Sequence, residues 1–95
     1  MNVIKLYECE VLYDPYRAGN HFRITDKTKY YVNADKIKYF KQFTQDYGKR
    51  PVPDVSMIYL DNGDYIVVHI DVEELANVLM GIENKDNSNK NKNIN

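Results

Sequence analysis

Side chains that commonly carry out catalysis are scarce in this sequence. It holds one cysteine, Cys9, and two histidines, His21 and His69. A cysteine nucleophile needs a base that takes up its proton, and no catalytic motif surrounds Cys9. Cys9 also falls on the apolar side of an alternating stretch, where cysteine packs as a small hydrophobic residue. We therefore expect no catalytic residues and no enzyme activity.

Two carboxylate pairs are the next candidates for chemistry. Asp61 and Asp64 bracket a tight-turn signal, and Glu73 and Glu74 lie in the first turn of an expected helix. Turn chemistry and helix capping account for both pairs. The first pair lacks the remaining ligands of a calcium-binding loop, and a single cysteine cannot form a Cys-based zinc site. No glycine-rich phosphate-binding loop occurs either. We expect no metal and no cofactor.

The charged residues are segregated along the chain, although the formal net charge is only −1. Residues 27–50 carry seven Lys or Arg and two Asp, a net charge of +5. Residues 51–84 carry seven Asp or Glu and no Lys or Arg, a net charge of −7. Opposite fields on one small body bear on partners rather than on fold. Either they neutralise each other in the folded domain, or the acidic part faces a basic partner.

The acidic segment provides the first candidate site. Its carboxylates come from an expected hairpin and the helix that follows, and together they suit a basic groove built for nucleic acid. The alternative is a solvated acidic face that keeps the protein soluble. The candidate partner-binding residues are Asp54, Asp61, Asp64, Asp71, Glu73 and Glu74.

The basic segment provides a second candidate site. Tyrosines interleave with lysines there, and aromatic rings stack on bases while lysines contact phosphates. The protein is not basic overall, however, as nucleic-acid-binding domains usually are. The candidate nucleic-acid-binding residues are Lys27, Lys29, Tyr31, Lys36, Lys38 and Lys41.

The hydrophobic pattern predicts an α+β fold, with a small, mainly antiparallel sheet, one or two short helices and the order β-β-β-α-β-β-α. Alternating apolar residues predict strands over 3–13, 21–25 and 29–32, with a turn at 26–28. Apolar residues three apart then predict a helix over 34–43 that begins at an Asn N-cap. A loop rich in Gly and Pro is expected over 45–53.

The second half of the chain carries a strong hairpin signal. Asn62-Gly63 predicts a two-residue turn that pairs Leu60 with Tyr65, and both faces of this hairpin are expected to be covered. Asp71 is the expected N-cap of a closing helix that Gly81 ends. Residues 1–82 form the expected single domain, and the Asn/Lys-rich residues 83–95 an expected disordered tail.

Residues 31–80 resemble the small flagellar and swarming-motility family FlbD. The resemblance rests on three stretches in the family's order, which read YVNADKI at 31–37, IYLDNG at 58–63 and VHIDVEEL at 68–75. It implies a non-catalytic accessory protein that acts by contact. It carries over no catalytic residues.

These observations together predict a small binding protein. Phe, Tyr, Met, Ile, Asn and Lys, whose codons are A/T-rich, make up 44 of the 95 residues, which suits a phage or mobile element. We expect an inhibitor, similar to anti-CRISPR proteins, that docks its acidic face on the basic groove of a host nuclease or defence ribonucleoprotein. The alternatives are a flagellar or motility accessory protein and a small nucleic-acid-binding protein.

Location and assembly are constrained less strongly. No apolar run approaches the length that spans a membrane, and the first residues lack the pattern of a secretory signal. We expect a cytoplasmic protein without a membrane partner. A homo-oligomer is compatible with all three functions.

Overall fold

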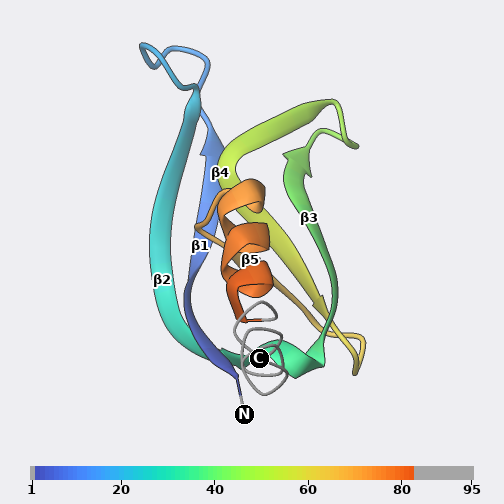
Figure 1. Ribbon diagram of the computed structural model, residues 1–95. Helices are drawn as coiled ribbons and strands as arrows, with labels where there is room; N and C mark the ends of the chain where they lie inside the picture. Colours follow the sequence, from blue (N-terminus) through green and yellow to red (C-terminus); the bar gives the residue numbers. More distant parts are fainter. Residues whose placement is uncertain (1, 83–95) are drawn as a thin grey trace, which may run out of the picture.

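The computed structural model describes residues 2–82, which form a five-stranded antiparallel sheet with a helix packed against it (Figure 1). The order across the sheet is β2-β1-β5-β4-β3, and the helix covers residues 72–82. This is the α+β class that the sequence predicts, with a different element order. The expected tail, 83–95, lies outside the described residues. The elements are β1 (Val3–Tyr13), β2 (Phe22–Asn33), the 3-10 turn η1 (Ala34–Lys36), β3 (Ile37–Gln45), β4 (Arg50–Leu60) and β5 (Tyr65–Val68).

Two of the expected strands are one. The predicted turn at 26–28 lies inside β2, which pairs with β1 along its whole length. Lys27 and Thr28 together lie opposite Glu8, because the register shifts by one residue there. A β-bulge of this kind accommodates an extra residue without reversing the chain. The polar, turn-like sequence therefore marks a bulge on an exposed strand rather than a turn.

The prediction of a helix over 34–43 is wrong. Asn33 does act as a cap, since its side chain accepts a hydrogen bond from the N–H of Asp35 at 3.0 Å, but only η1 follows before β3 begins. Lys38 is an extra residue in the pairing of β3 with β4. It places Ile37 and Phe40 against the same core, although they are three residues apart. A bulge therefore produces the spacing that resembles a helix.

The β4–β5 hairpin is present, but its pairing differs by one residue from the prediction. Tyr59 lies opposite Tyr65, and the N–H of Gly63 donates to the carbonyl of Leu60 at 3.1 Å. Gly63 has φ 93°, whereas Asn62 is not in the left-handed region. A loop with one glycine at positive φ reverses the chain just as a two-residue turn does. The longer loop accounts for the shift in pairing.

Two boundaries of elements also differ between the prediction and the structure. The loop expected over 45–53 is a turn of residues 46–49, in which Asp46 and Tyr47 take positive φ values before Gly48. Three left-handed residues reverse the chain in a short distance, so β4 begins early. Gly81 does not end the helix, because it does not take a positive φ and the helix continues through residue 82.

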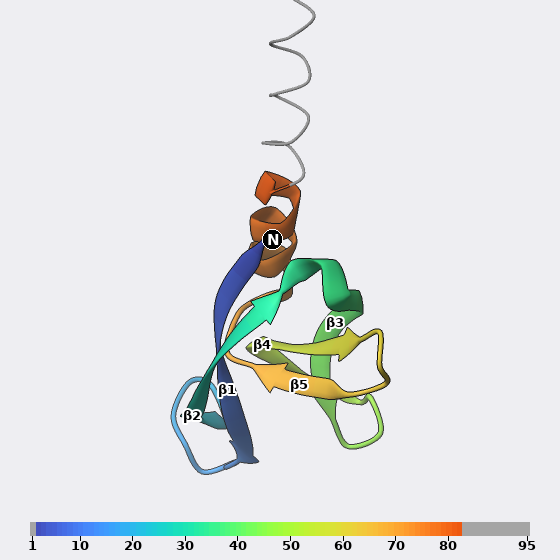
Figure 2. The ribbon, with the colours of Figure 1, turned by 90° about the horizontal axis from the view of Figure 1, so that it is seen from below.

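The main core lies between the helix and the inner face of the sheet. Leu75, on the helix, is fully buried, and Leu79 and Ile82 pack beside it. The core cluster that contains Leu75 includes apolar residues from every strand, and the helix lies over the middle of the sheet (Figures 1 and 2). The strand residues of this helix-side core are Ile4, Leu6, Val32, Ile37, Phe40, Ile58, Leu60, Ile66 and Val68.

A second core lies beyond the bulge in the β1–β2 hairpin. Its buried members are Cys9, Val52 and Val55. Strict alternation along residues 3–13 predicts that Tyr7 and Tyr13 share the buried face of Cys9, but both tyrosines are exposed. The bulge changes which face of β1 is buried, so β1 contributes to both cores.

The pairing between β1 and β5 is short. It consists of the pair Glu8–Val68 and a hydrogen bond from the N–H of His69 to the carbonyl of Tyr7, 2.8 Å. The β1–β2 hairpin and the β3–β4–β5 unit are therefore joined mainly by apolar contacts, in the helix-side core and in the second core. Ser56 helps to hold the helix start, because its buried hydroxyl donates to the carbonyl of Ile70 at 2.6 Å.

Within residues 2–82, no helix has the length and apolar character needed to cross a membrane.

Shortening Leu75 should destabilise the protein more than shortening a neighbour on the same helix. We expect Leu75→Ala to lower the free energy of unfolding by about 2–5 kcal/mol, because it leaves a cavity where the helix meets the sheet. Val78→Ala, at a position 40% exposed, should cost less than about 1 kcal/mol. Urea denaturation followed by circular dichroism measures both. Equal losses would contradict the anchoring role of Leu75.

Candidate binding surfaces

Cys9 packs as a small hydrophobic residue, as the sequence predicts. Its side chain is 5% exposed and lies in the second core. Burial, then the negative charges of Asp26 and Glu8, raise the pKa of the Cys9 thiol to about 11. Because of this raised pKa, the thiol is protonated at neutral pH, whereas a nucleophile must be a thiolate. His69, one of the two histidines that could serve as a base, lies close to Asp26 instead, with its Nδ1 2.7 Å from Asp26 Oδ1.

The six acidic candidates fall into two groups at opposite ends of β5. The first, which we call the helix-start group, is Asp54, Asp71, Glu73 and Glu74. Asp71 caps the helix, since its carboxylate accepts from the N–H of Glu73 at 3.1 Å. Asp54 lies two residues before Ser56, whose hydroxyl bonds to the residue preceding Asp71. Ser56 also pairs with Val68 at the end of β5, so Asp54 lies near the start of the helix.

The second acidic group is the hairpin loop, with Asp61 and Asp64. Asp61 Oδ2 lies 3.8 Å from Nζ of Lys36, a residue of the basic candidate set. Asp64 is held by Asn62, whose side-chain NH₂ donates to Asp64 Oδ2 at 3.1 Å and whose side-chain oxygen accepts from the Asp64 N–H at 3.0 Å. The six residues do not form one continuous patch.

Folding leaves most of the charge segregation in place. Within the described part of the chain, Lys36–Asp61 is the single ion pair between the basic segment, 27–50, and the acidic segment. Lys27 pairs instead with Glu10, and Arg50 with Asp46, each at 3.7 Å. No ion pair within residues 2–82 involves the helix-start group. Its negative charge therefore remains available to a partner.

The basic candidates are also divided among several places. Lys29 and Tyr31 lie on the outer face of the β1–β2 hairpin, where Lys5 is opposite Tyr31 and Tyr7 is opposite Lys29. We call these four residues the Tyr/Lys face. Tyr31 is 67% exposed, and Nζ of Lys5 lies 5.8 Å from the ring centroid of Tyr7. Sequence reasoning missed Lys5 and Tyr7, which only the strand register brings to this face.

Lys38 and Lys41 lie on β3, away from that face. Nζ of Lys41 is 5.6 Å from the ring centroid of Tyr59. Tyr59 stacks on Tyr39 with centroids 4.3 Å apart and lies 6.1 Å from Tyr65, so a row of tyrosines crosses three strands. The hairpin was expected to be covered on both sides, but this outer face is open: Tyr65 is 62% exposed.

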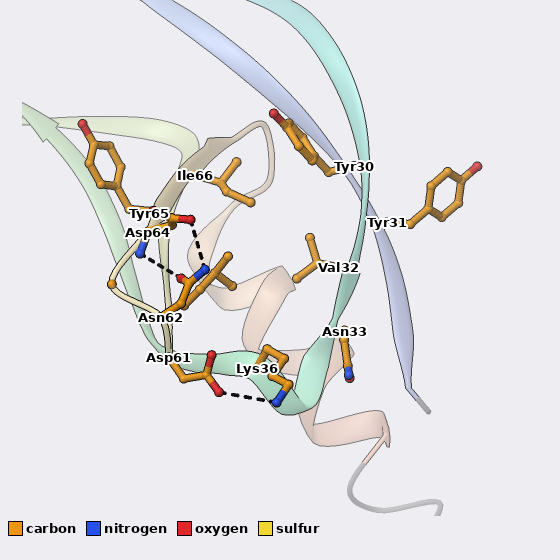
Figure 3. Close-up of a pocket in the computed structure, with 12 residues that line it drawn as sticks. Tyr30, Tyr31, Val32, Asn33, Lys36, Asp61, Asn62, Asp64, Tyr65 and Ile66 are labelled. Carbon is orange, nitrogen blue, oxygen red and sulfur yellow. Dashed lines mark hydrogen bonds and ion pairs between the residues drawn. The ribbon is translucent and has the colours of Figure 1, made fainter.

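A groove of about 710 Å³ lies between the end of β2 and the β4–β5 loop (Figure 3). It brings together members of both candidate sets, the acidic Asp61 and Asp64 and the basic Lys36. In Figure 3, Val32 and Ile66 point toward each other across the opening, whereas the ring of Tyr31 points away from it. The groove is lined by residues that include Tyr30, Val32, Lys36, Leu60, Asp61, Asn62, Asp64, Tyr65 and Ile66.

No cluster of three or more His, Cys, Asp or Glu side chains suited to a metal ion occurs among the described residues, 2–82. The expectations of no metal, no cofactor and no catalysis stay predictions.

Comparisons with protein-family models, curated proteins and solved structures found no match to this chain. The resemblance to the FlbD family therefore stays a prediction that rests on the three stretches quoted above.

The raised pKa of Cys9 predicts a loss of stability at alkaline pH. The folded thiol holds its proton up to about pH 11, whereas an unfolded thiol releases it near its ordinary value of 9.0. The stability that the buried thiol contributes is thus complete below pH 9.0 and is lost as the pH rises to about 11. The advantage of the native protein over Cys9→Ala, measured by urea denaturation, should shrink as the pH rises from 9.0 to about 11. An unchanged advantage would contradict this assignment.

Proposed function

We propose that this protein is a non-catalytic binding protein that docks its acidic surface on a basic surface of a protein or ribonucleoprotein. The observation that carries the proposal is the single ion pair between the basic and acidic segments of residues 2–82. Self-neutralisation is the main alternative explanation of the charge pattern, and one ion pair is too few for it. Exposed surface pairs also contribute little free energy, so they compete weakly with a partner.

The target class that fits this surface is a machine with a groove for nucleic acid, such as a host nuclease or defence complex. A protein that occupies such a groove inhibits the machine by excluding its nucleic acid. The complementary potentials would also accelerate association. The A/T-rich residue usage supports a phage or mobile-element origin, and a cytoplasmic location follows from such a target.

The helix-start group should control capture of the partner from a lysate of the native host. We design one variant with Asp54→Asn, Asp71→Asn, Glu73→Lys and Glu74→Lys. Asparagine keeps the helix cap at Asp71 and tolerates the φ of 65° at Asp54. We expect the captured amount at about 0.15 M salt to fall by more than tenfold, since several charge contacts are reversed.

A matched control variant carries the same total change of charge outside the acidic segment, with Asp14→Asn, Asp46→Asn, Glu10→Lys and Asp35→Lys. Circular dichroism confirms the fold of both variants. The control should change capture by less than about twofold. Equal capture by the native protein and the helix-start variant would contradict the proposal, and so would an equal loss in both variants, because net charge alone would then explain capture.

A second candidate function is binding of single-stranded nucleic acid. The Tyr/Lys face favours it, because two exposed lysines alternate with two tyrosines across a pair of strands. Aromatic rings on a sheet stack with bases, and lysines contact phosphates. Recovery of nucleic acid alone, washed off as the salt rises, would favour this function over the first.

A further inference from the structure

The groove between β2 and the β4–β5 loop has the composition of a binding site for a cation. Its charged lining residues are Lys36, Asp61 and Asp64, a net charge of −1. Lys36 and Asp61 pair with each other, so the carboxylate of Asp64 has no cation partner within residues 2–82. An anionic ligand, including a nucleotide phosphate, would meet repulsion from this carboxylate.

The carboxylate of Asp64 is held in place before any ligand arrives. Two hydrogen bonds tie Asp64 to Asn62, through the side-chain NH₂ of Asn62 and the backbone N–H of Asp64. Gly63 between them has φ 93°, which shapes the loop so that both side chains lie on the groove side of the hairpin (Figure 3). A carboxylate fixed in this way loses little conformational freedom when a ligand binds.

The remaining walls are aromatic and apolar. The ring of Tyr30, 37% exposed, stands at the upper end of the groove in Figure 3, whereas the ring of Tyr65 points away from the groove, on the side of Tyr59. Val32 and Ile66 line the space between the two strands. Aromatic faces attract cations, and apolar walls pack against the aliphatic part of a long side chain.

We propose that this groove takes an arginine side chain of the basic partner. The planar guanidinium stacks on an aromatic ring such as that of Tyr30, forms paired hydrogen bonds with one carboxylate and is less strongly hydrated than an ammonium group. The site is the hairpin-loop half of the acidic surface, so this inference rests on the proposed function and specifies its anchor. Buried arginines of this kind are frequent energetic centres of protein interfaces.

The test uses acetyl-Gly-Arg-Gly-amide as the probe in an NMR titration of the ¹⁵N-labelled full chain. A peptide with citrulline in place of arginine has the same shape without the charge. We expect the arginine peptide to shift the amide signals of residues 30 and 62–66, and to bind about tenfold more tightly than the citrulline peptide.

Two conservative variants identify the groups that bind. Asp64→Asn keeps an oxygen for the bond from Asn62 and removes only the charge, and it should weaken binding of the arginine peptide about tenfold. Tyr30→Leu keeps apolar bulk at the rim and should weaken it by at least about threefold. Asp35→Asn removes a carboxylate outside the groove and should leave binding unchanged.

Equal binding of the citrulline peptide, an unaffected Asp64→Asn variant, or shifts confined to residues outside the groove would overturn the inference. A nucleoside monophosphate that shifts the groove signals in place of the peptide would overturn it too. A different result would contradict the proposed function alone. That result is binding of the peptide in the groove without capture of a partner. Capture that depends on the helix-start group, without peptide binding, contradicts only the arginine anchor.

Discussion

The packing of Leu75 and its helix against the inner face of the sheet is the contact on which the rest of the structure depends. Backbone hydrogen bonds divide the sheet into the β1–β2 hairpin and the β3–β4–β5 unit, which meet at the pair Glu8–Val68 and at the bond from His69 to Tyr7. The cluster that contains Leu75 includes apolar residues from all five strands, and the second core also joins residues of both units. Burial of apolar surface is therefore what fixes the relative position of the two units. The groove between β2 and the β4–β5 loop depends on the same contact, because the strands that line it belong to different units.

The same arrangement determines where the charges lie. β4, β5 and the helix follow one another in the chain and hold all the acidic candidates, whereas most of the basic candidates are on β2 and β3 at the two edges of the sheet. The basic segment and the acidic segment form an ion pair where η1 meets the hairpin loop, between Lys36 and Asp61. The helix-start group lies at the other end of β5, beyond the reach of that pair. The topology therefore leaves most of the acidic candidates without an ion pair to the basic segment.

Local sequence patterns correctly predicted several features of the fold. β1 has the predicted bounds, the β4–β5 hairpin forms around Asn62-Gly63, and Asp71 caps the helix that follows. The main errors share one physical cause, since each involves a residue inserted into a strand pair. A bulge at Lys27 and Thr28 resembles a turn, and a bulge at Lys38 produces helical spacing. Whether an insertion ends a strand or bulges out depends on the partner strand, which the local sequence does not contain. The pairing of Lys5 with Tyr31 and the groove itself have the same origin in long-range register.

The central claim is that the acidic surface of β4, β5 and the helix faces the partner. Hydrogen–deuterium exchange, measured on the full chain alone and with its captured partner, tests this claim directly because bound segments exchange more slowly. The account predicts added protection at residues 60–66 and 71–75, with the outer face of β1 and β2 unchanged. Protection confined to residues 3–7 and 28–32 would contradict it and would assign recognition to the Tyr/Lys face.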